Sequence, residues 1–147
     1  MILSKQTSAH VMTSVEVDYE NISVLRNKIK GEFKKKEGFS LTFLPFISVA
    51  TINALREFPV VNSSFDLENN THDLHDFINL GIAVDLNREG LLVGTIKDSD
   101  SFNLRGLARK ITEVSSILRN KEYGLEDVTG STFTISNNGS FNSFITS

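Results

Sequence analysis

The stretch Gly130-Ser131-Thr132-Phe133-Thr134-Ile135-Ser136-Asn137-Asn138-Gly139 decides how the rest of the chain is interpreted. Its central residues are β-branched or aromatic, and such residues favour a pleated strand. The Ser-Asn-Asn-Gly that follows favours a tight turn, because Asn and Gly tolerate a left-handed backbone. The pattern therefore predicts a strand that gives way to a loop presenting the Ser136 hydroxyl, and such loops often carry reacting groups. The simpler interpretation of the pattern alone is a strand end capped by a turn.

Length and composition restrict the class of protein. The chain has 147 residues, 39% hydrophobic and 22% charged, which suits one globular domain with a substantial core. The net charge of -3 gives no general attraction to nucleic acid or anionic membrane, so we expect neither as a partner. No cysteine is present, which excludes disulfides, thiolate metal sites and a cysteine nucleophile and suits the reducing cytoplasm. No apolar run approaches the ~20 residues that span a bilayer, and no secretory signal is recognised.

Three segments show helical patterns. Over 19–37, Asp18 or Asn21 is a possible cap, and one face carries Ile22, Leu25, Ile29 and Phe33. The other face of this helix is basic, and a solvated face is the simpler interpretation than a partner-docking patch. Residues 44–55 are apolar nearly all round and predict a buried core helix closed by Pro59. Residues 104–118 carry a third apolar stripe, for which Ser101 is the predicted cap.

Strands are predicted between and before these helices. Val11, Val15 and Val17 alternate with polar residues, as in a half-buried strand. Residues 64–67 and 74–86, joined by a turn at 68–70, predict a hairpin that continues into a longer strand, and 91–96 returns after a turn at 87–90. His72 and His75 superficially suggest a metal site. On a strand, however, side chains three positions apart point to opposite faces, so we expect no metal site there.

The opening motif resembles the signature loop G-S-T-F-T-I-S-N-x-G of the dihydrolipoamide acyltransferase catalytic domain. These enzymes are the E2 components of 2-oxoacid dehydrogenase complexes and are relatives of chloramphenicol acetyltransferase. Further stretches resemble the family in the same order along the chain: Met1–Lys5 (M-x-x-S-K), Val15–Asp18 (E-V-D), Pro59–Asn62 (P-x-x-N), Gly81–Val93 (G-I-A-V…G-L-x-V) and Leu125–Gly130 (L-x-x-D-x-x-G). Gly94-Thr95 departs from the Pro-Val usual in the family, and a glycine is expected to loosen the strand.

The resemblance implies a fold and an activity. The implied fold is α/β, a two-layer mixed sheet with packed helices like that of chloramphenicol acetyltransferase. Residues 1–147 would be the N-terminal portion of the catalytic domain, C-terminally incomplete. The implied reaction moves an acyl group from acyl-dihydrolipoamide to coenzyme A, with both thiols as substrates and no cofactor bound. The implied partners are further copies, as a homotrimer or larger core, and the other components of the dehydrogenase complex.

The resemblance also assigns residues. Ser136 matches the serine that donates to the oxyanion, and Ser4 and Asn137 are the implied substrate-binding residues. The family's base is a histidine in D-H-R-x-x-D-G, which nothing in these residues matches. His10 lies where the family often has a histidine, but we expect it to have a structural role. Asn138 and Asn142 replace the apolar residue and glycine usual in the loop. We therefore expect this chain alone to be inactive; the alternative is a non-catalytic scaffold or assembly relative.

Overall fold

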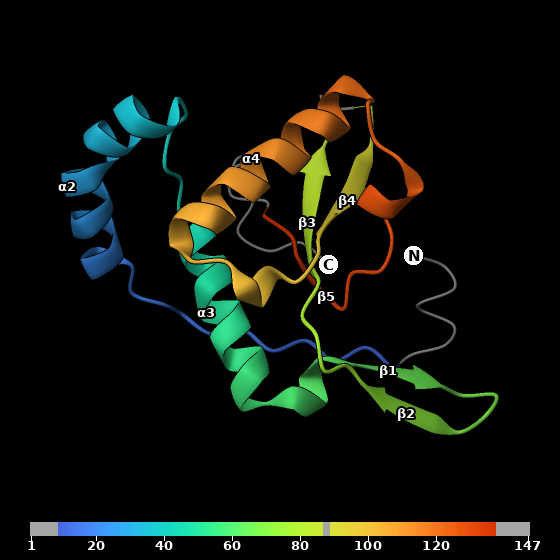
Figure 1. Ribbon diagram of the computed structural model, residues 1–147. Helices are drawn as coiled ribbons and strands as arrows, with labels where there is room; N and C mark the ends of the chain where they lie inside the picture. The colour runs from blue at the N-terminus through green and yellow to red at the C-terminus, as the bar shows by residue number, and fades with distance from the viewer. Residues whose placement is uncertain (1–8, 87–88, 138–147) are drawn as a thin grey trace.

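The computed structural model describes residues 9–86 and 89–137. Three α-helices and five strands alternate with short 3-10 turns along this part of the chain (Figure 1). The α-helices are α2 (Glu20–Glu37), α3 (Leu44–Glu57) and α4 (Leu104–Asn120), and the 3-10 turns are η1 (Pro59–Val61), η2 (Ser99–Ser101) and η3 (Leu125–Asp127). The strands are β1 (Ser63–Asp66), β2 (Thr71–Leu74), β3 (Leu80–Asp85), β4 (Leu91–Ile96) and β5 (Phe133–Ile135).

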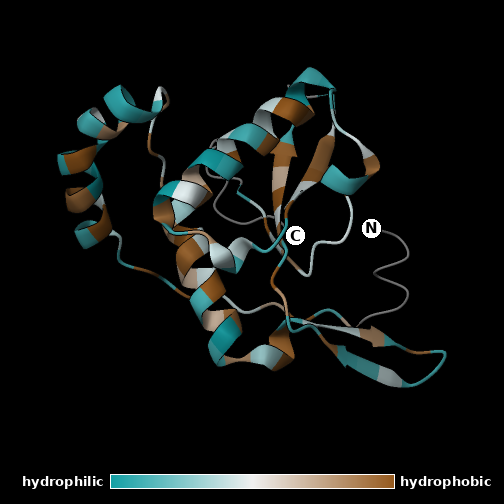
Figure 2. Cartoon of the chain, in the orientation of Figure 1, coloured by the Kyte–Doolittle hydropathy of each residue, from teal (hydrophilic) through white to brown (hydrophobic). Residues whose placement is uncertain are grey.

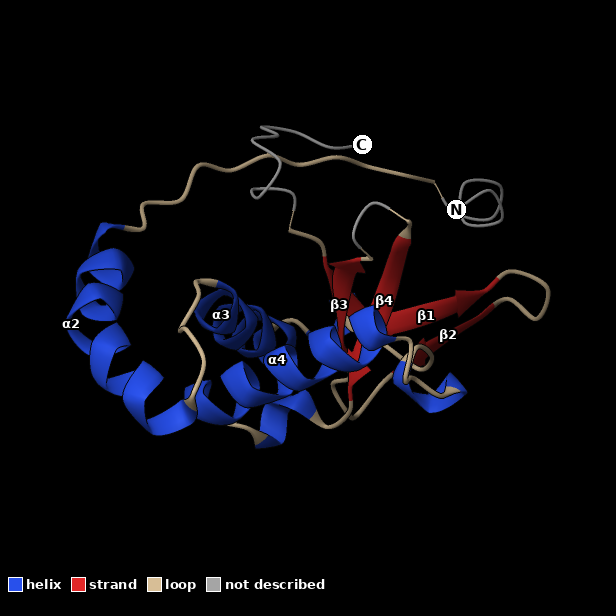
Figure 3. Cartoon of the chain, turned by 90° about the horizontal axis from the view of Figure 1, so that it is seen from above, coloured by secondary structure: helices blue, strands red, loops and turns tan. Residues whose placement is uncertain are grey.

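The strands form two separate sheets. One has the order β4-β3-β5, with β3 antiparallel to β4 and parallel to β5, so it is mixed as predicted. The other is the β1–β2 hairpin, which projects from the lower right in Figure 1. Seen from above, α3 and α4 lie together beside the first sheet (Figure 3). The predicted α/β class with helices packed on a mixed sheet is therefore confirmed.

The core lies between α4, α3 and one face of the mixed sheet. Strands β3 and β4 are strongly hydrophobic, and α4 presents an apolar stripe to them (Figure 2). The buried apolar side chains of this cluster are Ile52, Leu55, Ile78, Leu80, Ile82, Val84, Ile96, Leu107, Ile111, Val114 and Leu118. Burying such side chains contributes about 1.5–3 kcal/mol each, so this cluster dominates the stability of the described chain.

Gly94 does not loosen its strand, contrary to the expectation from sequence. β4 stays paired along its whole length, and Gly94 lies opposite Ile82. A Cβ at Gly94 would overlap Val114 Cγ1 and lie 2.9 Å from Leu118 Cδ1. The glycine therefore lets α4 approach the sheet more closely than any other residue at this position would.

The long strand predicted over 74–86 is broken in the middle. Asn62 is buried, and its Nδ2 donates to the carbonyl oxygens of Phe77 at 2.8 Å and His75 at 3.3 Å. Its own carbonyl accepts from the His75 amide at 3.1 Å. Because these bonds occupy the backbone of 75–77, β2 ends at Leu74 and the chain enters the second sheet as β3.

The helix N-caps lie one or two residues away from the predicted positions. Helix α4 is capped by Asn103, whose Oδ1 accepts from the Gly106 amide at 2.9 Å, whereas Ser101 belongs to η2. Helix α2 has Tyr19 at its N-cap position, and Asp18 Oδ1 accepts from the Glu20 amide at 2.8 Å.

The N-terminal third packs less than predicted. Residues 9–18 form no strand in the part of the chain that the structure describes, and Val11 and Val17 are 90% and 65% exposed. A strand needs a neighbouring strand for its backbone groups, and none of the described strands pairs with this segment. Helix α2, to one side of α3 and α4 in Figures 1 and 3, has no fully buried residue.

Helix α3 buries one face rather than all of its surface. Pro45, Ser48, Ile52 and Leu55 are buried, whereas Ala54 on another face is exposed. None of the helices in the described ranges has the length and apolarity needed to cross a membrane.

Candidate functional site

The loop that carries Ser136 begins where the edge strand β5 ends. β5 pairs in parallel with β3, in the register Leu80 to Phe133 and Ile82 to Ile135. Phe133 and Ile135 are half-buried and Thr134 is exposed, as the alternation of a strand requires. The predicted strand is therefore confirmed, and Ser136 follows it directly as an exposed residue.

Asn137 places the start of this loop against the helical layer. It lines an open groove together with the beginning of α3 and the second half of α4. The groove has apolar and polar walls, formed by Thr42, Phe43, Leu44, Ile111, Thr112, Ser115, Ser116, Arg119 and Asn120. The loop thus borders a surface that offers hydroxyl, amide and guanidinium groups together with apolar side chains.

Ser4 of the predicted site, and several residues of the predicted turns and loop, are not described. Ser4, Asn87, Arg88, Asn138 and Asn142 lie outside residues 9–86 and 89–137. The structure therefore places Ser136 and Asn137 side by side at the end of β5, and their relation to Ser4 remains a prediction.

The three histidines lie in other parts of the molecule. His10 is exposed in the extended N-terminal segment. His72 Nε2 is 2.7 Å from Ser63 Oγ, and His75 Nε2 is 3.2 Å from Ser64 Oγ. The two imidazoles of the hairpin therefore bond different serines, and the described residues contain no cluster of three His, Asp or Glu suited to a metal.

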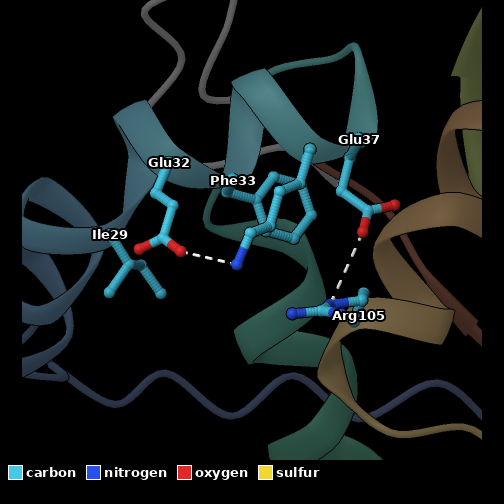
Figure 4. A pocket seen from close by; sticks show the side chains of 6 residues that line it. Ile29, Glu32, Phe33, Glu37 and Arg105 are labelled. Carbon is cyan, nitrogen blue, oxygen red and sulfur yellow. Dashed lines mark hydrogen bonds and ion pairs between the residues drawn. The ribbon is translucent and has the colours of Figure 1, made fainter.

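Displaced pKa values occur in ion pairs and in the hairpin turn rather than beside Ser136. Figure 4 shows Glu37 pointing toward Arg105 in the pocket between α2 and α4. Arg109 donates to both carboxyl oxygens of Glu37, at 2.5 and 3.0 Å, and holds the pKa of Glu37 below its ordinary value. The Lys121 ammonium likewise lowers the pKa of Glu89. These shifts mark structural pairs and identify no general base for the serine loop.

Sequence reasoning missed one polar residue that contacts the serine strand. Asn79 precedes β3 and donates from Nδ2 to the carbonyl oxygen of Gly130 at 2.9 Å. Its only signal in the sequence is an amide side chain directly before an apolar strand, a position that turn residues commonly occupy.

Curated relatives match nearly all of this chain. It is 37% identical over 145 residues to the succinyltransferase component of the 2-oxoglutarate dehydrogenase complex of Cupriavidus necator, covering 99% of this chain and 34% of that protein. This chain therefore spans about a third of the length of that relative.

Solved structures match as well. A probable dihydrolipoamide acetyltransferase from Listeria monocytogenes superposes with a TM-score of 0.93 and 37% identity, covering 99% of this chain and 61% of that chain. The Azotobacter vinelandii dihydrolipoamide acetyltransferase, studied for the catalytic roles of a serine, a histidine and an asparagine, gives 0.88 and 30%, covering 95% and 56%. A cubic core of a pyruvate dehydrogenase complex gives 0.77 and 30%, covering 84% and 50%.

The family model described as "2-oxoacid dehydrogenases acyltransferase (catalytic domain)" matches residues 1–147. The matched range includes the serine loop after β5. This chain belongs to the 2-oxoacid dehydrogenase acyltransferase family.

Proposed function

We propose that this chain is the serine-bearing part of an acyltransferase that moves an acyl group from acyl-dihydrolipoamide to coenzyme A. The observation that carries the proposal is the exposed Ser136, held directly after β5 in a chain that matches the acyltransferase catalytic domain throughout. Residues 1–147 then act as one portion of that domain, with the serine loop at its reactive edge.

Thioester exchange needs a base and a donor to the oxyanion. The base removes the proton of the coenzyme A thiol, and the resulting thiolate attacks the carbonyl carbon of the acyl-dihydrolipoamide thioester. The new carbon–sulfur bond forms as the carbonyl oxygen becomes an oxyanion, to which the Ser136 hydroxyl donates. Collapse of this intermediate breaks the bond to the dihydrolipoamide sulfur, which receives the proton from the base. Both thiols are substrates, so the reaction needs no bound cofactor.

The base is supplied from outside these residues in our proposal. No D-H-R-x-x-D-G stretch occurs in the sequence, and His10, His72 and His75 lie on segments other than β5. We infer that a histidine of another segment or another chain faces Ser136 when copies associate. The likeness to a cubic core of a dehydrogenase complex supports such self-association. A homotrimer or larger core in the cytoplasm, with the other dehydrogenase components as partners, completes the proposal.

The exposed apolar side chains give a physical reason for association. Val11 and Met12 in the N-terminal segment and Val24 in α2 are 90%, 67% and 64% exposed. β5 also lies at an edge of its sheet, and unpaired edges and apolar patches promote contact with other chains. Self-association would cover both kinds of surface.

The experiment is a complementation assay between two chains. This chain is mixed with a full-length relative that carries Ser→Ala at the position matching Ser136, and transfer from acyl-dihydrolipoamide to coenzyme A is measured. We expect the mixture to regain activity, and Ser136→Ala in this chain to lower the rate about 10²–10³-fold. Thr134→Ala, an exposed change in the same strand, is the matched control and should keep the activity.

The same assay separates the alternatives. Native mass spectrometry shows whether mixed oligomers form. Mixed oligomers without activity would mean that the chain is a scaffold and that Ser136 only ends a strand. This chain alone should show no transfer, and turnover that disappears in His10→Ala would instead identify His10 as the base.

A further inference from the structure

Asn79 is bonded through both its backbone and its side chain to the segment that leads into β5. Its carbonyl oxygen accepts from the Thr132 amide at 2.8 Å, and its own amide is 3.2 Å from Thr132 Oγ1. Its Nδ2 donates to the Gly130 carbonyl oxygen at 2.9 Å. Its Oδ1 accepts from the amide of Asp98 at 2.9 Å. The residue thus uses its backbone donor and acceptor and both ends of its side-chain amide.

These bonds join three segments at one end of the mixed sheet. Asn79 directly precedes β3, Asp98 follows β4, and Gly130 precedes β5. Both side-chain bonds reach residues with left-handed backbones, since φ is +46° at Asp98 and +79° at Gly130. Glycine adopts this conformation freely, whereas at Asp98, which has a side chain, it persists only where the surroundings hold it. The Asn79 amide therefore holds the turn after β4 and the turn before β5 against each other.

The bonds matter because β5 is short, so its register rests on two contacts: the packing of Phe133 and Ile135 against the core and the bonds at the start of the strand. The strand is three residues long, lies at the sheet edge and pairs only with β3 in the described chain. A slip by one residue turns every side chain of a strand to the opposite face. A slip of β5 would bring Ile135 or Asn137 to the place that Ser136 occupies. The position of the serine hydroxyl consequently depends on the contacts at the start of the strand together with this packing.

We propose that Asn79 is a positioning residue for Ser136, acting by fixing the register of β5 through its paired bonds to Gly130 and Asp98. The proposal rests on the proposed function, because positioning has a catalytic meaning only if Ser136 contributes to acyl transfer. Asn79 itself does not touch substrate in this scheme. An amide is required because one end donates and the other accepts.

Two variants distinguish the two hydrogen bonds that the Asn79 side chain makes. Asn79→Ala removes both side-chain bonds, whereas Asn79→Asp keeps an acceptor for the Asp98 amide and loses the donor to Gly130. Asn69→Ala is the matched control, because Asn69 also uses its side-chain amide in a turn, bonding Asp66 at 2.6 Å in the hairpin. Circular dichroism and thermal unfolding identify which variants remain folded, and only folded variants are compared.

The first readout is the complementation assay with the full-length relative. We expect kcat, expressed per mole of mixed oligomer counted by native mass spectrometry, to fall at least 10-fold in both Asn79 variants, with KM for coenzyme A within twofold and with Asn69→Ala unchanged. A merely structural loss would lower the amount of active oligomer without changing the register of the remaining strand. A kcat within twofold of the unmodified chain in both folded variants would overturn the proposal.

The second readout is nuclear magnetic resonance on this chain alone, and it requires no activity. In the unmodified chain, Gly81 and Thr134 should show a cross-strand contact because they are paired in the register. The proposal expects this contact to weaken or shift to a neighbouring residue in both Asn79 variants, and an unchanged contact would overturn it. If the unmodified mixture is inactive, the proposed function fails and the catalytic role of Asn79 fails with it. Loss of the Gly81–Thr134 contact would then still show that Asn79 fixes the strand.

Discussion

Helices α2 and α4 are similar in length, but α2 has a weaker apolar stripe and differs in what it contacts. They have 18 and 17 residues, and each carries apolar side chains on one face. Helix α4 buries five of its residues against the sheet and α3: Leu107, Ala108, Ile111, Val114 and Leu118. Helix α2 has no fully buried residue. An apolar stripe therefore indicates that a helix will have a partner, but it does not say which segment or chain provides it.

Helix α2 is held by polar and aromatic contacts instead. Arg26 donates from Nε to the Leu41 carbonyl oxygen at 2.7 Å, and its guanidinium lies 4.7 Å from the centre of the Phe43 ring. At the other end, the Glu37 carboxylate pairs with Arg105 and Arg109 of α4. Contacts of this kind orient a helix but bury little apolar surface. Helix α4 is therefore part of a well-packed hydrophobic core, whereas the apolar side chains of α2 lie outside it.

The largest expected effect comes from truncating a leucine in each helix. Leu118→Ala should lower the free energy of unfolding by about 2–5 kcal/mol, because Leu118 is fully buried and its loss leaves a cavity. Leu25→Ala in α2 should change it by less than about 0.5 kcal/mol, because Leu25 is 48% exposed. Urea unfolding of the two variants measures the difference. Equal losses would mean that α2 packs as firmly as α4.

A pair of glycine substitutions gives an intermediate effect with opposite signs. Gly94→Ala should destabilise the chain by about 1–3 kcal/mol, because the new methyl would overlap Val114 of α4. Gly31→Ala lies within α2, where no atom approaches the new methyl within 4 Å. It should stabilise by up to about 1 kcal/mol, because alanine has the higher helix propensity. Thermal unfolding of both variants tests the signs, and a stabilising Gly94→Ala would contradict the close approach of α4.

The smallest expected effect is a dependence on pH at the Glu37 pair. Arg109 lowers the pKa of Glu37 in the folded chain, so this pair stabilises the docking of α2 above the ordinary carboxyl pKa. The stabilisation is lost as the pH falls through the lowered value. The absence of native cysteine allows fluorescent labels at Lys28→Cys and Glu122→Cys to report the separation of α2 and α4.

The labels should move apart as the pH falls, and Glu37→Gln should separate them already at pH 7. Glu113→Gln is the control, because Glu113 pairs with Lys110 inside α4 at 2.9 Å and does not bridge to α2 through that bond. If the distance between the labels changes neither with pH nor in the Glu37→Gln variant, the ion pair does not hold the helix.

Local patterns predicted the elements well, and distant contacts explain the errors. The strand before Ser136, the antiparallel return of 91–96 and the stripe of α4 follow from short-range periodicity. The break after Leu74 depends on Asn62, whose amide bonds carbonyls 13 and 15 residues away. The role of Gly94 depends on its close approach to Val114 of α4, and no local sequence pattern predicts a contact between positions so far apart. The strand predicted over 11–17 needs a neighbour that the described residues do not provide.

The same distinction applies to the candidate site. Ser136 and Asn137 can be proposed as site residues from the sequence because the motif that contains them is contiguous, and their role stays a prediction. Asn79 was missed because its bond to Gly130 spans 51 residues. Sequence reasoning therefore finds groups that sit in one loop, whereas groups that position the loop from another segment require the structure.

Hydrogen exchange at increasing chain concentration tests the central claim most directly. The claim, which rests on the proposed self-association, is that a second copy covers the apolar face of α2. The account predicts fast exchange for the amides of α2 in the dilute chain and slow exchange for those of α4. As light scattering shows association, the α2 amides should become protected while those of α4 stay unchanged. Association that leaves the exchange of α2 unchanged would contradict the account.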